Sequence, residues 1–406
     1  MKVLACVSGV GRGHAARSRP LLEALVARGH ECVAATPGRR AAALLEDVCP
    51  VLRSPPDFGA AVSPAARERV AFTLIYDFEM AFAHYQRDVR ASTTAVVAFV
   101  ASAVDAVRPD LVIVDQIPPA SAVARDRGVP VVQVTHGPLV PECDPWAYWL
   151  GARPDELQVP PVLPAVNEAL ATARVAPIQQ VNELLEGDLL LIPGSEVLGT
   201  SDGALHVDLP ALLPPDELEH PELPAGSRPR VAVLLATART QVAESVRGIV
   251  AAGGEALVVE GEAAAAESGP AVTILGRVHI KELLRSVDAV VHHGGAGSVL
   301  ESLAAGTPSV AIPTHTEQEF NARRLAATGA GILVPVNDGP LETLRIQDRF
   351  VTLGHRRTHG LAARVTAALA QLLQGTHGEA AARQRAAGSS LISVELAVDA
   401  IEALVR

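Results

Sequence analysis

Aromatic side chains are scarce in this sequence: two Trp, three Tyr and seven Phe make up 3% of its 406 residues. Basic side chains are outnumbered too, because 34 Lys and Arg face 45 Asp and Glu, which leaves a net charge of −11 and a pI near 5.6. Proteins that bind the phosphate backbone of nucleic acids need clustered Lys and Arg. The charge balance therefore argues against nucleic acid as a partner.

Only four cysteines are present, Cys6, Cys32, Cys49 and Cys143, and no two of them have CxxC spacing. Cys6 and Cys32 stand in apolar runs that are typical of buried strands. We therefore predict structural thiols in a reducing cytoplasm rather than metal ligands or disulfides.

Long apolar runs are missing as well. The first run, in MKVLACVSGVGRGH, is interrupted by Gly, Arg and His too early for the core of a signal peptide. No stretch approaches the ~18 to 20 apolar residues that cross a bilayer. The sequence predicts a cytoplasmic protein without stable membrane insertion.

What is present is a regular alternation of short apolar runs with helical stretches. The chain is too long for one ordinary core, and 49% of its residues are hydrophobic, which predicts two domains. We assign residues 1–205 to the first domain. Its apolar runs lie at 3–8, 31–36, 110–115 and 129–135. Near-continuous apolar strands separated by helices indicate a parallel sheet covered on both faces.

Pro, Gly, Asp and Glu dominate residues 206–230, which we interpret as a linker. The alternation then resumes and predicts a second doubly wound α/β domain over residues 231–385. Its expected strands lie at 231–237, 256–261, 272–276, 289–293, 309–313 and 331–335. Residues 386–406 predict a C-terminal helix, for which packing back on the first domain is left open.

A glycine-rich turn follows the fourth strand of the second domain, in HHGGAGSVLESLAAGTPSVAIPTHTEQEF. Glycines let the backbone approach a ligand closely, and the free N–H groups at the start of the next helix favour an anion such as a diphosphate. His293 can donate to a phosphate oxygen. Glu301, one turn into the helix, can accept from two vicinal hydroxyls such as those of ribose. Glu317 and Gln318 offer hydrogen-bonding groups that suit a sugar.

This ordered set resembles the donor-binding signature of UDP-glycosyltransferases and of bacterial antibiotic and other natural-product glycosyltransferases. The resemblance implies a GT-B fold, in which two Rossmann-like domains face a central cleft. It also implies that the pyrophosphate is held by His293 and the backbone from Gly295 to Ser298, the ribose by Glu301, and the donor sugar by Glu317 and Gln318. The nucleotide base would contact Arg277 and Val278. The residues carried over at the glycine turn are Gly295, Ala296, Gly297 and Ser298.

The chain departs from the family at the start of the second domain. Members often carry Gly-Ser after the first strand of this domain, where a second phosphate contact is made, but this chain has Ala-Thr-Ala-Arg. Thr237 or Arg239 would have to replace that contact, with the Arg supplying charge in place of backbone donors.

A candidate base follows the first strand of the chain. Gly9, Gly11 and Gly13 surround a turn that ends at His14, where the dinucleotide-binding fingerprint would require Gly or Ala. An imidazole with a pKa near neutrality can remove the proton from an acceptor hydroxyl, and a carboxylate on its other nitrogen would orient it. Asp115, which closes another strand at the same sheet edge, is the expected partner. The family uses such a pair at matching positions.

Ten of the twelve aromatic residues precede residue 150. Two interpretations remain open for them: packing in the core, or an apolar acceptor pocket in the first domain. The candidate acceptor-binding residues are Phe78, Phe82, Tyr85, His136 and Trp146.

The resemblance implies a metal-independent, inverting glycosyltransferase with His14 as general base and a UDP- or dTDP-sugar as donor. Retaining members carry a second Glu eight residues on, where this chain has Leu325 after Glu317, and no DxD metal motif occurs at the donor site. We expect no resident cofactor, a small apolar or aromatic acceptor, and a monomer or homodimer. A UDP-sugar 2-epimerase of the same fold and a catalytically silent nucleotide-sugar-binding relative are the alternatives.

Overall fold

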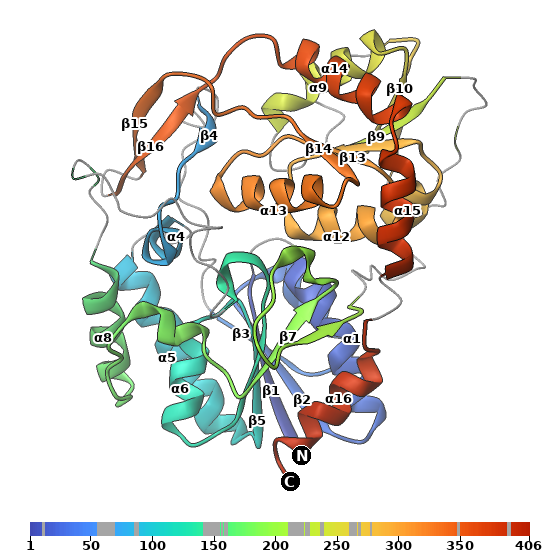
Figure 1. The fold of residues 1–406 in the computed structure, drawn as a ribbon. Helices are drawn as coiled ribbons and strands as arrows, with labels where there is room; N and C mark the ends of the chain where they lie inside the picture. The colour runs from blue at the N-terminus through green and yellow to red at the C-terminus, as the bar shows by residue number, and fades with distance from the viewer. Residues whose placement is uncertain are drawn as a thin grey trace.

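The computed structural model contains two α/β domains, one above the other in Figure 1, each built on a parallel sheet. It describes residues 1–9, 13–54, 70–84, 89–140, 155, 157, 161–209, 223, 228–235, 239–259, 266, 269–276, 278–346, 350–387 and 391–406.

The first sheet has the strand order β3-β2-β1-β5-β6-β7-β8, and all neighbouring strands are parallel. Its strands are β1 (Lys2–Val7), β2 (Glu31–Thr36), β3 (Val51–Arg53), β5 (Leu111–Asp115), β6 (Val131–Val134), β7 (Leu189–Pro193) and β8 (Leu205–Val207). The order reverses between β1 and β5, and ligands of open α/β sheets bind at the carboxyl ends of such strands. Because β8 ends at Val207, this sheet extends past residue 205, where the sequence placed the end of the first domain.

Helices cover both faces of the first sheet and place two separate apolar cores against it. The α-helices are α1 (Gly13–Ala27), α2 (Arg39–Ala43), α4 (Phe78–His84), α5 (Val89–Val107), α6 (Pro119–Asp126) and α8 (Val162–Thr172). The short 3-10 helices are η1 (Gly137–Leu139), η2 (Val181–Leu185) and η3 (Glu196–Leu198). Continuous burial along β1 and β5 explains their unbroken apolar sequences.

Helix α5 is long and apolar enough to cross a membrane by length and composition alone, with a mean hydropathy of 1.3, although the sequence was expected to contain no such stretch. Its apolar residues face the first core, and α6 and α8 pack against it. Val97 and Val100 are fully buried. We therefore assign α5 to the interior of the first domain.

Three cysteines lie within the described residues, Cys6, Cys32 and Cys49, and all three are buried free thiols. Burial raises the pKa of Cys6 and of Cys32 to about 12. These thiols are therefore protonated and pack as small apolar groups. Cys143 lies outside the described residues.

The second sheet has the order β11-β10-β9-β12-β13-β14, again with all neighbouring strands parallel. Its strands are β9 (Arg230–Leu234), β10 (Glu255–Val259), β11 (Val272–Leu275), β12 (Ala289–His292), β13 (Ser309–Ala311) and β14 (Gly331–Leu333). Its helices are α9 (Arg239–Ala251), α11 (Ile280–Arg285), α12 (Ala296–Ala305), α13 (Thr316–Ala327), α14 (Leu361–Gln374) and α15 (His377–Ala387). The order reverses between β9 and β12, so the glycine turn after β12 stands at the equivalent of the first domain's switch point.

A segment of the first half of the chain belongs to the second domain. Strand β4 (Val70–Thr73) pairs with the hairpin of β15 (Leu341–Ile346) and β16 (Phe350–Arg356) in a three-stranded antiparallel sheet. In Figure 1 the blue β4 lies beside the orange-red β16. Ala71, Phe72 and Leu74 are buried in the core of the second domain.

The end of the chain returns from the second domain to the first. Helix α16 (Val394–Ala403) packs on α1, and Ala397, Val398 and Ile401 are fully buried in the first domain. Arg28 pairs with Asp399 at 2.5 Å, and the backbone of Ile392 pairs with that of Val207. The structure thus places the C-terminal helix on the first domain, beside the N-terminus (Figure 1).

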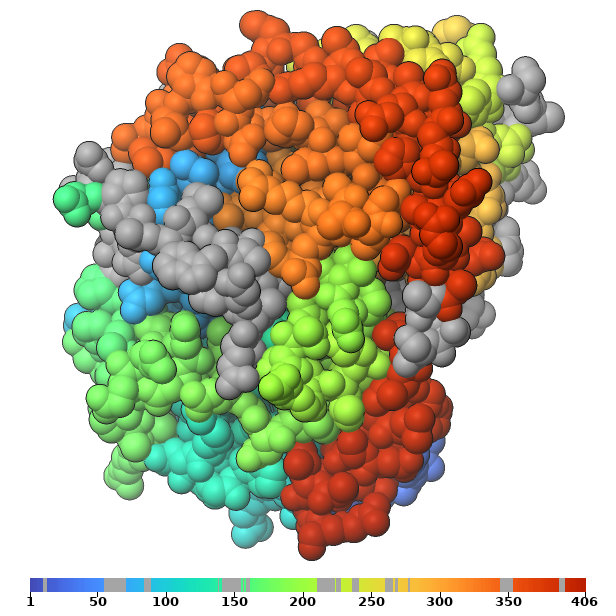
Figure 2. All heavy atoms as spheres, viewed as in Figure 1, coloured from blue at the N-terminus to red at the C-terminus, as the bar shows by residue number. Residues whose placement is uncertain are grey.

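An apolar contact joins the two domains directly. Leu198 of η3 is fully buried among Val299 and Leu303 of α12 and Leu325 of α13. The side chain of Arg324 adds a hydrogen bond from Nε to the carbonyl of Val197 at 2.8 Å. Figure 2 shows the yellow-green surface of this part of the first domain against the orange surface of α13.

Removing the ring of Phe72 should destabilise the second domain although the residue belongs to the first half of the chain. Phe72 is 1% exposed, and truncation of a buried aromatic ring costs about 3–5 kcal/mol. We expect Phe72→Ala to lower the free energy of unfolding by that amount and to speed amide hydrogen exchange in β9 and β12. Phe78→Ala is the matched control, with faster exchange expected in the first domain. Equal acceleration in both domains would contradict the assignment of β4.

Candidate active site

His14 and Asp115 meet at the switch point of the first sheet. His14 lies in the first turn of α1, which follows β1, and Asp115 is the last residue of the neighbouring β5. The Nδ1 atom of His14 is 2.8 Å from Oδ1 of Asp115. The structure therefore brings together the two residues that the sequence suggested as a base and its orienting carboxylate.

The carboxylate of Asp115 is fully buried and receives hydrogen bonds on both oxygens. Arg17 donates from Nε to Oδ2 at 2.8 Å and from Nη2 to Oδ1, and Ser18 donates its hydroxyl to Oδ2 at 2.8 Å. Burial alone would raise the pKa of Asp115, but the charges and hydrogen bonds of Arg17 and His14 lower it below its ordinary value. Asp115 is therefore a carboxylate at neutral pH.

Arg17 and Ser18 were not identified from the sequence. They lie three and four residues after His14 in the same helix, and residues at these spacings share one face. This spacing could have pointed to them, because a buried carboxylate next to that helix face needs hydrogen-bond donors.

The imidazole of His14 is set up to accept a proton. Burial lowers its pKa, Asp115 opposes this effect, and the positive charge of Arg17 adds to it, with the net pKa below 6.5. Asp115 can only accept a hydrogen bond, so Nδ1 carries the proton and Nε2 keeps its lone pair. This is the state that a general base requires.

His136 and Glu317 join the two domains beside this pair. His136 precedes η1 and accepts a hydrogen bond on Nδ1 from Nη1 of Arg17 at 2.9 Å. Its Nε2 atom lies 3.9 Å from Oε1 of Glu317 in the first turn of α13. Groups expected to act on the acceptor and on the donor sugar therefore stand next to each other.

The N-terminus of α12 is free of side-chain caps and of acidic residues in its first turn. Gly294 has a φ of +79°, and a Cβ there would lie 2.6 Å from the carbonyl oxygen of Gln318. A Cβ on Gly295 would lie 2.4 Å from Nε2 of His293. A side chain at position 294 would therefore meet the start of α13, and one at position 295 would displace the His293 ring. The first-turn N–H groups of α12 have no acceptor within the helix and are of the kind that can bind an anion.

Which ring nitrogen of His293 carries the proton decides whether this residue can donate to a phosphate. Its Nδ1 atom is 3.3 Å from the carbonyl oxygen of Leu234, which can only accept. Nδ1 is therefore protonated, and Nε2 can donate to a phosphate only when the ring is positively charged. Burial lowers the pKa of His293, partly offset by the Leu234 carbonyl. A bound diphosphate would raise that pKa again through its negative charge.

Glu301 and the start of α13 carry the remaining residues that were expected to bind the donor. Burial raises the pKa of Glu301 to about 7, although Lys281 opposes the shift. Burial also raises the pKa of Glu317, whereas Asn321 and Arg17 lower it. Gln318 is 4% exposed, and its Oε1 accepts hydrogen bonds from the backbone and hydroxyl of Thr314 at 2.8 and 2.7 Å. Gln318 thus holds the loop before α13.

The crossing segment around β4 supports the same loop. The backbone N–H of Thr73 donates to the carbonyl of Thr314 at 2.8 Å, and that of Ile75 donates to the hydroxyl of Thr316 at 2.9 Å. The position of Glu317 at the start of α13 therefore depends on residues from the first half of the chain.

Comparison with known proteins identifies the class to which this arrangement belongs. Residues 1–157 match the model of glycosyl transferase family 1, and residues 260–372 match the C-terminal domain of proteins like erythromycin biosynthesis protein CIII. The chain is a glycosyltransferase of the GT-B fold. It is 28% identical over 372 residues to L-demethylnoviosyl transferase from Streptomyces niveus. This alignment covers 84% of this chain and 87% of that protein.

Solved glycosyltransferases share the fold of this glycosyltransferase over its whole length. The structure of VinC in complex with dTDP superposes with a TM-score of 0.68 at 20% identity and covers 100% of this chain and 99% of VinC. The spinosyn rhamnosyltransferase SpnG, complexed with spinosyn aglycone, gives a TM-score of 0.62 at 20% identity, with 99% and 100% covered.

Other residues singled out from the sequence have different positions. Phe78 and Phe82 are each 6% exposed and pack edge to face in the core of the first domain, with ring centroids 6.2 Å apart. Core packing is thus what the structure shows for these two rings, and their acceptor role stays a prediction. Val278 is 5% exposed in the core below β10 and β12.

Five of the predicted site residues lie outside the described part of the structure, one of them by its side chain alone. Arg239 begins α9, but its side chain is not among the described ones. The residues that lie outside the described part of the chain are Tyr85, Trp146, Thr237 and Arg277.

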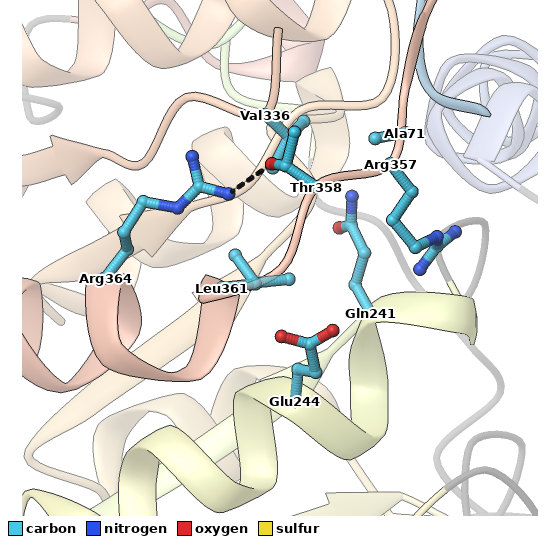
Figure 3. A pocket seen from close by; sticks show the side chains of 8 residues that line it. All are labelled: Ala71, Gln241, Glu244, Val336, Arg357, Thr358, Leu361 and Arg364. Atoms are coloured by element: carbon cyan, nitrogen blue, oxygen red, sulfur yellow. Dashed lines mark hydrogen bonds between the residues drawn. The ribbon is translucent and has the colours of Figure 1, made fainter. Parts of the chain in front are cut away.

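A small cavity in the second domain of the glycosyltransferase is lined by none of these residues. It lies between α9, α14 and β4, and Figure 3 shows Gln241 and Glu244 facing Arg357 and Thr358 across it. The cavity volume is about 10 Å³, the size of one water molecule. Gln241 is 1% exposed, and neither amide atom has a hydrogen-bond partner among the described residues. The cavity suits a water molecule and excludes a sugar or a nucleotide.

Replacing Asp115 should destabilise the first domain because Arg17 would keep a buried charge without its carboxylate. The Arg17 side chain is 11% exposed, and breaking a buried ion pair costs about 3–5 kcal/mol. We expect Asp115→Asn to lower the free energy of unfolding by this amount in denaturant titrations and Arg17→Met to restore part of it in the double variant.

Asp47→Asn is the control for this experiment. It removes the exposed partner of Arg19 on the same helix, where an ion pair contributes at most about 1 kcal/mol. Equal free energies of unfolding for the Asp115 and Asp47 variants would show that the buried ion pair contributes no more to stability than the exposed one.

Proposed function

We propose that this glycosyltransferase transfers a sugar, with inversion, from a UDP- or dTDP-sugar to a small apolar or aromatic natural-product acceptor. The observation that carries the proposal is the meeting of the His14–Asp115 pair with the donor side, through His136 and Glu317 at 3.9 Å. A base and a sugar-binding carboxylate on opposite domains are what a single displacement between two bound substrates requires.

In the proposed reaction, Nε2 of His14 takes the proton of the acceptor hydroxyl while the acceptor oxygen bonds to the anomeric carbon. The bond from that carbon to the diphosphate oxygen breaks, and the nucleoside diphosphate leaves with the electron pair. Asp115 stabilises the imidazolium of His14 that results. Attack from the side opposite the leaving group inverts the anomeric centre.

The donor half of the proposal rests on α12. Its uncapped N-terminus and a charged His293 would balance the diphosphate, so the reaction needs neither a divalent ion nor a resident cofactor. Glu301 would accept hydrogen bonds from the ribose. A dTDP complex of VinC supports a nucleoside diphosphate of this class as the donor's carrier.

The acceptor half rests on the relatives and on the position of His14. SpnG has been crystallised with spinosyn aglycone, and the relative from Streptomyces niveus is an L-demethylnoviosyl transferase. Both support a small natural product as the acceptor class for this chain. The acceptor hydroxyl would lie within hydrogen-bonding distance of Nε2 of His14.

Nucleotide affinity should depend on the ionisation of Glu301. With a pKa of about 7, only about a tenth of this carboxyl is charged at pH 6, so we expect UDP to bind roughly tenfold more weakly at pH 6 than at pH 8 in calorimetry. The terminal phosphate also titrates in this range, so Glu301→Gln supplies the baseline. The loss should be smaller with dTDP, whose sugar lacks one hydroxyl. An identical pH dependence in the Gln variant would remove Glu301 from the ribose site.

Replacing His14 should slow turnover strongly while nucleotide affinity stays unchanged. We expect His14→Ala to lower the rate of nucleoside diphosphate release roughly 10²- to 10⁴-fold, the usual contribution of a general base. The assay uses an acceptor panel of polyketide and aromatic aglycones with a chelator present, and proton NMR of the product gives the anomeric configuration.

The alternatives give different results in the same assay. A 2-epimerase would change the donor sugar with no acceptor present, and a silent binding protein would bind nucleotide without releasing product. A retained anomeric configuration, or activity only with added metal, would overturn the inverting or the metal-independent part of the proposal.

A further inference from the structure

Arg17 makes more contacts within the candidate site than any role as a simple ion pair requires. It lies one turn after His14 in α1, and its side chain is 11% exposed. Its guanidinium donates to both oxygens of Asp115 and, from Nη1, to Nδ1 of His136 at 2.9 Å. Nη2 also lies 2.9 Å from Nδ1 of His14. A planar fork with five N–H donors can satisfy such a set, whereas an ammonium group cannot.

The donors and acceptors around His14 allow only one position for its ring proton. Asp115 accepts only and Arg17 donates only, because a guanidinium keeps its charge in proteins. If Nδ1 of His14 accepted from Arg17, its lone pair would face the carboxylate 2.8 Å away. Nδ1 therefore donates to Asp115, Nη2 directs its hydrogen to the same carboxylate, and Nε2 of His14 keeps its lone pair.

The ring proton of His136 has the opposite position. Its Nδ1 accepts from Arg17, so the proton of the neutral ring is on Nε2. This N–H group is directed to the side of Glu317, whose Oε1 lies 3.9 Å away. One guanidinium thus contacts two imidazoles in opposite tautomers, one of them the base and the other next to the donor-sugar carboxylate.

We propose that Arg17 is a positioning residue: its guanidinium orients Asp115, which holds the proton on Nδ1 of His14, and by donating to Nδ1 of His136 it places the proton of that ring on Nε2. This inference rests on the proposed function, in which His14 is the base. Arg17 touches neither substrate, and it acts through the three side chains that it contacts.

Charge is the second part of this role. The groups that face His14 are Arg17 on its own helix, Asp115 from β5 and His136 from the segment after β6, with Glu317 of α13 behind His136. Burial lowers the pKa of both imidazoles most, and the charge of Arg17 lowers both further. The base thus stays neutral at pH values where an unmodified histidine would begin to protonate.

Two substitutions separate the geometry of Arg17 from its charge. Arg17→Gln removes the positive charge. Arg17→Lys keeps the charge, but a single ammonium group cannot donate to Asp115 and His136 at the same time. Arg19→Gln is the matched control, because Arg19 lies two residues away on α1 and binds Glu23 and Asp47 instead of the site.

The direct measurement is NMR of histidine labelled at its ring nitrogens, with assignments from His14→Gln and His136→Gln. In the unaltered enzyme we expect His14 protonated on Nδ1 and His136 on Nε2. In Arg17→Lys, His136 should become a mixture of tautomers while His14 titrates as before. In Arg17→Gln, His14 should also titrate at higher pH. Equal tautomers for the two rings in the unaltered enzyme, or spectra of both Arg17 variants that match Arg19→Gln, would overturn the proposal.

The kinetic measurement is the pH profile of kcat/KM. Loss of activity at low pH reports protonation of the base, so a raised pKa moves this limb to higher pH. We expect Arg17→Gln to move it by roughly one unit, about a tenfold loss at a pH below the limb, and Arg17→Lys to leave it in place. An unshifted limb in Arg17→Gln would contradict the charge effect.

The two measurements also separate this inference from the proposed function. If no acceptor is glycosylated by the unaltered enzyme, the proposed function fails, and the NMR spectra still decide the proton positions. If Arg17→Gln does not fold, as circular dichroism would show, the unaltered enzyme and Arg17→Lys decide them.

Discussion

The buried carboxylate of Asp115 is the interaction on which the arrangement of the site depends. A carboxylate with no exposed surface is tolerated only if its oxygens receive hydrogen bonds from well-placed donors, and here His14, Arg17 and Ser18 supply them. All three donors come from the first turns of α1. The requirement to satisfy one charge at the end of β5 therefore orients the helix that follows β1, and with it the nitrogen that would take up the proton.

The position of Glu317 relative to this carboxylate follows from two exchanges of chain between the domains. β4 leaves the first half of the sequence, adds a strand to the hairpin of the second domain and holds the loop before α13. α16 returns from the second domain and packs on α1. With the apolar contact of η3 against α12 and α13, these crossings hold Glu317 near His136. The separation of His14 from Glu317 is thus a property of the whole fold rather than of either domain.

Charge is distributed differently on the two sides of the site. In the first domain Arg17 and Asp115 neutralise each other, and the lowered pKa values of His14 and His136 keep both imidazoles uncharged at neutral pH. In the second domain the free N–H groups of α12 present partial positive charge without any acidic residue in the first turn. An anionic leaving group would therefore be attracted to the second domain, and the base in the first would not compete for it.

The sequence alone determined the two-domain α/β architecture, because unbroken apolar strands that alternate with helices allow little else. The six strands of the second sheet and the glycine turn after β12 were readable for the same reason. His14, Asp115, His293 and Glu301 were selected because they lie at or after the ends of such strands and match a family pattern, and their chemical roles stay predictions. The contacts between segments that are distant in the sequence were decided by the tertiary structure. Only folding placed Arg17 between Asp115 and His136, moved β4 into the second domain, and buried Phe78 and Phe82. These outcomes depend on contacts across a hundred residues or more, or on which side of a helix is covered, and no local pattern records either.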